Sequence, residues 1–129
     1  MGRKQGKIVI QSGVNVWPHE LKTAQSYTAI GKDVEFVKRS DVRHATSADC
    51  IIDSEVWEMK APTASSLRRV QRTLRDALKQ SQNVIFDSRR MKGIPDSAIE
   101  RELRKWAPEL KSLRRLQFVN RHGAIIDIK

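Results

Sequence analysis

Two carboxylates and an amine occur within the stretch Asp49-Cys-Ile-Ile-Asp-Ser-Glu-Val-Trp-Glu-Met-Lys60. Its β-branched and aromatic residues favour two strands joined by a two-residue turn at Asp53-Ser54. The resulting hairpin pairs Ile52 with Glu55, Ile51 with Val56, Cys50 with Trp57, and Asp49 with Glu58. Opposed residues share one face of a sheet, with Cβ atoms about 4.5–5.5 Å apart, and strand alternation adds Lys60 to that face. We therefore expect Asp49, Glu58 and Lys60 to converge.

Opposed carboxylates repel each other, so this arrangement is destabilising unless another charge compensates it. A divalent cation bound by Asp49 and Glu58 would compensate it, and hard oxygen ligands suit Mg²⁺, with Mn²⁺ and Zn²⁺ as alternatives. Lys60 could then orient an attacking water or stabilise charge that develops on a phosphate. The alternative is a solvated hairpin in which Lys60 only neutralises its acidic neighbours.

The net charge of +10 is distributed unevenly along the 129 residues. Residues 1–65 carry 9 basic and 8 acidic residues, whereas residues 66–129 carry 16 basic and 7 acidic residues. The acidic cluster thus lies in a nearly neutral half, and the other half is strongly cationic. This distribution suits a polyanion that one half binds and the other half cuts. It would equally suit a non-catalytic binder of nucleic acid or of an anionic membrane.

Cysteine content and hydropathy exclude several classes of protein. The one cysteine, Cys50, cannot form an intrachain disulfide, and we expect it to be a buried small hydrophobe. No apolar run approaches the roughly 20 residues of a membrane span, and no phosphate-binding glycine-rich loop is present. The histidines, His19, His44 and His122, are scattered, so no local motif supports a metal-free histidine mechanism, although such a mechanism is not excluded.

The elements that must position the cluster form a mixed α/β fold, a mixed β-sheet flanked by helices. Strands are expected at 8–10, 33–37, 83–87, 116–120 and 124–128, in addition to the hairpin. A helix at 18–30 starts with Pro18 and buries a stripe ending at Ile30. A second helix is capped by Ser65-Ser66 and buries Leu67, Val70, Leu74 and Leu78. A third starts with a capping box, Ser97 to Glu100, and is limited by Pro108.

The second helix also carries a basic stripe, because Arg68, Arg72, Arg75 and Lys79 follow one another at intervals of four, three and four. One acid, Asp76, interrupts it. We expect these cations to contact phosphates, with a solvated helix face as the alternative. Arg89 and Arg90 are further candidates for nucleic-acid contact. In the first helix, Glu20 and His19 could face the hairpin, although a favourable interaction with the helix dipole would also explain Glu20.

Asp49 followed by Glu58-Met-Lys60 resembles the PD-(D/E)xK nuclease signature, with Ala48 where that pattern has proline. A closer resemblance covers most of the chain. The stretches at 14–23, 33–36, 48–49, 55–60, 77–81 and 83–87 are similar to the C-terminal toxin domains of contact-dependent growth inhibition proteins, which are tRNA-cleaving nucleases. The resemblance implies a restriction-endonuclease-like fold and a catalytic set of Glu20, Asp49, Glu58 and Lys60, with Gln80 and Thr23 as weaker candidates.

The resemblance also implies a metal-assisted endoribonuclease acting on tRNA, and an immunity protein that blocks it. An acidic inhibitor would complement a site surrounded by cations. We expect a basic lead over residues 1–13 and one nuclease-like domain over 14–129. The toxin would act in the cytoplasm of a target bacterium. Family toxins are tails of long secreted proteins, whereas this chain starts with Met1, so a cut-out domain and a free-standing relative both remain open. A DNA nuclease and a non-catalytic module are the alternatives.

Overall fold

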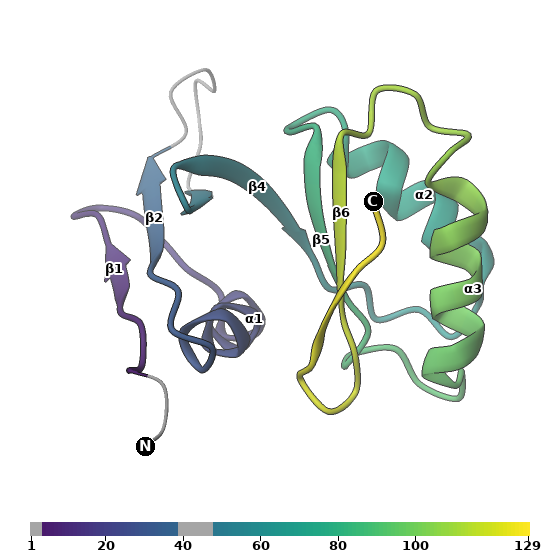
Figure 1. Cartoon of the computed structure of the whole chain (residues 1–129), viewed down its shortest axis with the longest axis horizontal. Coiled ribbons are helices and arrows are strands. Elements are labelled where there is room, and N and C mark those ends of the chain that lie inside the picture. Colours follow the sequence, from purple (N-terminus) through teal and green to yellow (C-terminus); the bar gives the residue numbers. More distant parts are fainter. Residues whose placement is uncertain (1–3, 39–47) are drawn as a thin grey trace. The chain divides into compact units, whose positions relative to one another are not determined.

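A computed structural model describes residues 4–38 and 48–129 of the chain. It divides into two compact units, Met1–Trp57 and Glu58–Lys129, which are described separately below. Figure 1 shows the elements of each unit. The predicted single domain over 14–129 stays a prediction. His44 and the other residues at 39–47 lie outside the described residues.

The described residues contain seven strands, which are hydrogen-bonded in the order β1 to β7, and three helices. The strands are β1 Ile8–Ile10, β2 Val34–Lys38, β3 Ala48–Ile52, β4 Glu55–Lys60, β5 Asn83–Asp87, β6 Arg115–Val119 and β7 Ile125–Asp127. Parallel pairing joins β1 to β2, β4 to β5 and β5 to β6, and the other neighbours are antiparallel. The mixed α/β class is therefore confirmed. None of the helices in the described ranges combines the length and apolarity that a membrane span requires.

The hairpin of β3 and β4 has the predicted turn and register. Asp53 and Ser54 have φ values of 52° and 65°, the left-handed backbone that a two-residue type I′ turn requires. Lys32 forms an ion pair with Asp53 beside the turn. The pairs of Cys50 with Trp57, Ile51 with Val56 and Ile52 with Glu55 are confirmed.

In the N-terminal unit, α1 spans Pro18–Thr28. Its Ala24 and Tyr27 are buried, as are Phe36, Cys50 and Trp57 of the strands. The helix ends two residues earlier than predicted, so Ile30 lies beyond it and is exposed. The backbone explains this end, because Tyr27 O accepts hydrogen bonds from the amides of Ile30 and Lys32 and the chain turns away.

The C-terminal unit is built on a fully buried β5, with α2 (Arg68–Ala77) and α3 (Asp96–Trp106) on one side of β5 and β6 (Figure 1). Val70 and Leu74 of α2 are buried as predicted, whereas Leu67 and Leu78 are only partly buried at the edge of the core. The remaining buried contacts come from Thr73 and Ala77. The helix core therefore uses smaller side chains than the leucine stripe indicated.

The predicted capping box of α3 is wrong. The helix begins at Asp96, so Ser97 lies inside its first turn, and Glu100 forms an ion pair with Arg104 instead. The cause is tertiary. The Asp96 carboxylate accepts hydrogen bonds of 2.8 Å from the Ser88 hydroxyl and 2.8 Å from the Arg121 amide. For α2, the Ser66 hydroxyl accepts a hydrogen bond from the Arg68 amide, although Leu67 is the N-cap residue.

Replacing Ser54 with glycine should stabilise the protein. A left-handed backbone costs a non-glycine residue about 1–2 kcal/mol, and the larger unfolded-state entropy of glycine offsets roughly half of that gain. We expect Ser54→Gly to raise the free energy of unfolding by a few tenths to about 1 kcal/mol, measured by urea denaturation. The matched control is Ser112→Gly, at an exposed position without a positive φ, which should be neutral or slightly destabilising. Equal effects of both substitutions would contradict the prediction.

Candidate functional site

The Glu58 and Lys60 side chains form an ion pair in the second half of β4. Lys60 Nζ lies 3.6 Å from Glu58 Oε2, with the Glu58 side chain 12% exposed and that of Lys60 32% exposed. These residues pair with Val84 and Phe86 of the parallel strand β5, which are completely buried. Registered neighbours point to one face of a sheet, so the ion pair lies on the apolar face of the C-terminal unit.

This environment determines what the pair can do. Apolar neighbours and partial burial reduce solvent screening, so the attraction between the two charges is stronger than for an exposed pair. A separation of 3.6 Å is too long for a good hydrogen bond. Lysine has three N–H donors, so the Lys60 ammonium is oriented by Glu58 and has further donors for a water or a phosphate oxygen.

Asp49 lies on β3 in the N-terminal unit, where it is half-buried and pairs with Val37 of β2. The described ladder between β3 and β4 reaches Cys50 and Trp57, the pair that precedes Asp49 and Glu58. The register on which the predicted convergence depends is thus confirmed. The pairing of Asp49 with Glu58 joins the two units and stays a prediction.

The three candidates on α1 have local roles in the helix. Glu20 Oε1 accepts a hydrogen bond of 2.9 Å from the Trp17 amide, which caps the first turn. The buried Thr23 hydroxyl donates to the His19 carbonyl at 3.0 Å. The His19 ring stacks on that of Trp17, with centroids 6.5 Å apart. These contacts account for the placement of Glu20, Thr23 and His19, and their catalytic roles stay predictions.

Among the described residues, a metal ion would have to rely on few protein ligands. Within residues 4–38 and 48–129 there is no group of three or more His, Cys, Asp or Glu side chains that could hold one. A four-ligand zinc site of the structural type is therefore not formed there. Mg²⁺ is compatible with so few protein ligands, because it commonly takes one or two carboxylates and completes its coordination shell with water and substrate phosphates. The predicted ligands Asp49 and Glu58 belong to different units, so their shared metal site stays a prediction.

The predicted basic stripe lines a surface groove of about 810 Å³ on α2. Arg68, Arg72, Arg75 and Lys79 are all exposed and all line it. Arg69 lines it too, which the 4-3-4 spacing missed although the adjacent Arg68-Arg69 pair was visible in the sequence. Among the described residues no carboxylate pairs with Arg68, Arg69 or Arg72, whereas Lys79 pairs with Asp76 at 3.5 Å.

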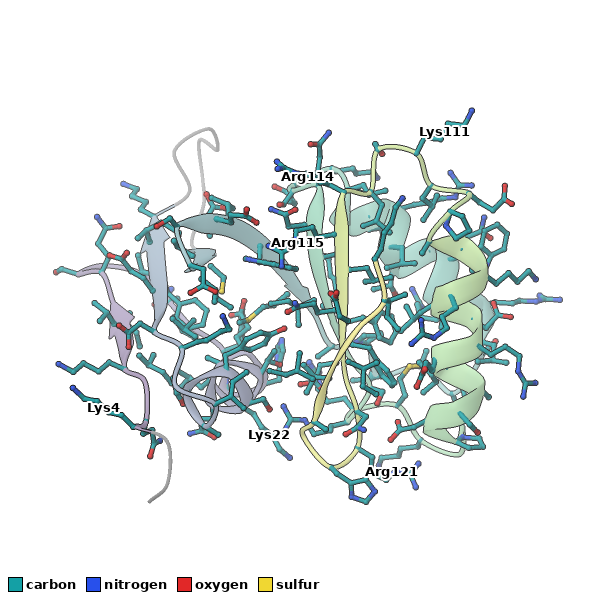
Figure 2. All side chains as sticks on the ribbon, viewed as in Figure 1. Lys4, Lys22, Lys111, Arg114, Arg115 and Arg121 are labelled. Carbon is teal, nitrogen blue, oxygen red and sulfur yellow. The ribbon has the colours of Figure 1, made fainter. Side chains whose placement is uncertain are left out.

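A second groove, of about 460 Å³, shares Arg75 with the first and includes Lys111. Figure 2 shows Lys111 extending from the loop after α3, with Arg114 and Arg115 at the start of β6. The cationic surface of the C-terminal unit therefore continues from α2 onto this loop. Gln80, the other candidate of this unit, is exposed just after α2.

Arg89 has a structural partner that sequence reasoning missed. Its guanidinium donates to the Asp87 carboxylate at 2.7 and 3.1 Å, and its amide donates to the same carboxylate at 2.9 Å. Asp87 is only 2% exposed, so Arg89 compensates a buried charge. The Asp-x-Arg spacing was the available signal. Arg90 is exposed and stays a candidate for nucleic-acid contact.

Comparisons with known proteins identify relatives of the chain. A solved CdiA-CT/CdiI toxin and immunity complex from Burkholderia pseudomallei shares its fold, with a TM-score of 0.70 and 17% identity over 96% of this chain and 99% of that chain. No curated protein matches the sequence. A family model described as the contact-dependent growth inhibition CdiA C-terminal domain matches residues 46–125, more than half of the chain. The chain therefore belongs to the contact-dependent growth inhibition CdiA C-terminal domain family.

Proposed function

We propose that this chain is a nuclease toxin of interbacterial competition, an endoribonuclease that hydrolyses the phosphodiester backbone of tRNA. The observation that carries the proposal is the half-buried Glu58–Lys60 ion pair on β4. Membership of the growth-inhibition family supports the toxin role. The choice of tRNA rests on the resemblance of the sequence to tRNA-cleaving toxin domains.

In the proposed reaction, Lys60 donates hydrogen bonds to the attacking water or to a non-bridging phosphate oxygen. The water oxygen bonds to phosphorus and gives up a proton to solvent, while the bond from phosphorus to the leaving sugar oxygen breaks and that oxygen takes up a proton from solvent. Glu58 keeps the ammonium oriented, and Asp49 adds a second carboxylate. A divalent cation held by Asp49 and Glu58 would supply Lewis-acid stabilisation of the phosphate charge.

The α2 groove is the proposed binding surface for the substrate backbone. Arg68, Arg69 and Arg72 lie along it without carboxylate partners among the described residues, so their charges are available to phosphates. The likeness to a toxin and immunity complex supports an immunity protein as the second partner. We expect that protein to be acidic, since it must cover a cationic toxin. The site of action would be the cytoplasm of the target bacterium.

Removal of the ion pair should abolish cleavage. We expect Lys60→Ala, Glu58→Gln and Asp49→Asn each to lower the initial rate of tRNA cleavage at least about 100-fold, because the groups act as a unit. Cleavage is followed on gels with purified tRNA and Mg²⁺ or Mn²⁺, and folding is checked by circular dichroism. The control Glu100→Gln removes a carboxylate from the Glu100–Arg104 ion pair on α3 and should cleave normally.

Duplex DNA of similar length, offered in the same assay, separates this proposal from a DNA nuclease of the same fold. Intact tRNA after incubation with the unmutated protein and several divalent metals would overturn the proposal. Normal binding of tRNA without cleavage would instead assign the chain to non-catalytic binding modules.

Loss of charge from the groove should weaken binding and its salt dependence together. Each phosphate contact contributes roughly 0.7–0.9 to the slope of log affinity against log salt. We expect Arg72→Gln with Arg75→Gln, in the Lys60→Ala background, to flatten this slope by about 1.5 for tRNA. Labelled tRNA is titrated at several salt concentrations, and the free energy of unfolding should change by less than about 1 kcal/mol.

The matched control removes two charges from exposed positions on α3, with Arg101→Gln and Lys105→Gln. It should leave the slope nearly unchanged. If both double variants have the same slope, the groove contributes only net charge, and the contact surface must lie at Arg90 and the Lys111 to Arg115 segment.

A further inference from the structure

Trp17 presents its ring to solvent at the start of α1. Its exposed fraction is 61%, the highest among the large hydrophobic side chains that the structure describes as exposed. The other two tryptophans differ, since Trp57 is buried in the N-terminal unit and Trp106 packs against the core of the C-terminal unit. A tryptophan ring buries a large apolar area when it acquires a partner, so this exposure points to a ligand.

The start of α1 holds Trp17 by hydrogen bonds to its backbone and not to its ring. The Trp17 amide donates to Glu20 Oε1 at 2.9 Å, and its carbonyl accepts from the amides of Glu20 and Leu21 at 3.0 and 3.1 Å. Pro18 follows and restricts Trp17 to the extended backbone that it has. Two backbone hydrogen bonds and one bond from the Trp17 amide to the Glu20 side chain therefore fix the Trp17 backbone, and none of them depends on the indole.

The ring is also part of a flat aromatic surface. The planes of Trp17 and His19 differ by only 15°, with centroids 6.5 Å apart. Nearly parallel rings at this distance form an offset stack, which supports the indole from one side. Nucleic-acid contact also benefits from a cation, and α1 carries the exposed Lys22 (Figure 2).

We propose that Trp17, supported by His19, is a stacking platform for an unpaired base of the RNA substrate. The inference rests on the proposed function for the identity of the ligand. Every base has a π-face that can stack on an indole, but only an unpaired base can leave its neighbours to do so. Under the proposed function the substrate supplies such bases, because RNA presents unpaired bases in loops, bulges and ends. The hydrogen bond to Glu20 places the platform beside a candidate catalytic residue.

The test compares Trp17→Leu with Trp17→Phe in the inactive Lys60→Ala background. Base stacking on an aromatic ring is worth about 5- to 150-fold in affinity. We expect Trp17→Leu to weaken binding of a labelled unpaired oligoribonucleotide by that factor, and Trp17→Phe to retain most of the affinity. A fully paired duplex of the same sequence should bind all three proteins equally. The oligoribonucleotide should also quench tryptophan fluorescence in the parent protein, and this quenching should disappear in Trp17→Leu.

A control for the loss of exposed apolar surface is Val9→Ser, on β1 of the same unit, which should bind RNA normally. Unchanged affinity of Trp17→Leu, or an equal loss for unpaired and duplex RNA, overturns the platform and leaves the ring as a protein-contact residue. The unmutated protein is assayed for cleavage separately. If the unmutated protein cleaves tRNA and Trp17→Leu binds RNA with unchanged affinity, the proposed function stands and the platform is excluded. If the Trp17 ring binds unpaired bases but the unmutated protein does not cleave tRNA, the platform stands and the proposed function is excluded.

Discussion

The register of the β3–β4 hairpin is the constraint on which the candidate site depends. Alternation along a strand has a period of two, so a slip of one residue would move every side chain of β4 to the opposite face. Glu58 and Lys60 would move together to the other face, and Met59 would take their place on the face of Val84 and Phe86. The left-handed backbone at Asp53 and Ser54 fixes the length of the turn, and thereby the register. A conformationally costly turn is therefore retained at the place where an error would exchange the polar and apolar faces.

Residue types and their spacing predicted the parts of the fold that depend only on residues close together in the sequence. The turn at Asp53-Ser54 and the buried strand at 83–87 follow from residue types and their alternation. The exposed cations of α2 follow from helical spacing in the same way. The start of α3 was missed because it depends on Asp96 contacting Ser88 and Arg121, the latter 25 residues away. A local stretch of sequence does not show which polar residue near a helix start will form hydrogen bonds with residues distant in the sequence.

In the candidate site, too, local spacing predicted the contacts within one strand but not those that depend on distant residues. The ion pair of Glu58 and Lys60 follows from an i, i+2 spacing on one strand, and the structure has it. The contribution of Asp49 depends on a pairing between the two units and could be argued only from the register. Arg89 illustrates the opposite case, since its charge suggested a nucleic-acid contact, which stays a prediction, and spacing did not show that it also neutralises buried Asp87. A basic residue next to a buried acid should be assigned to that acid first, and to a nucleic acid only when it remains exposed.

At the start of α1, the backbone of residue 17 is fixed by hydrogen bonds that do not involve its side chain. Glu20 and Leu21 bond to main-chain atoms of residue 17, so the helix start does not depend on which side chain is present. Proline is the one residue excluded by this arrangement, because it has no amide hydrogen to donate. Selection can therefore exchange the ring at this position for other side chains at little cost in folding. A surface feature anchored in this way can diverge quickly between related toxins while the scaffold beneath it stays the same.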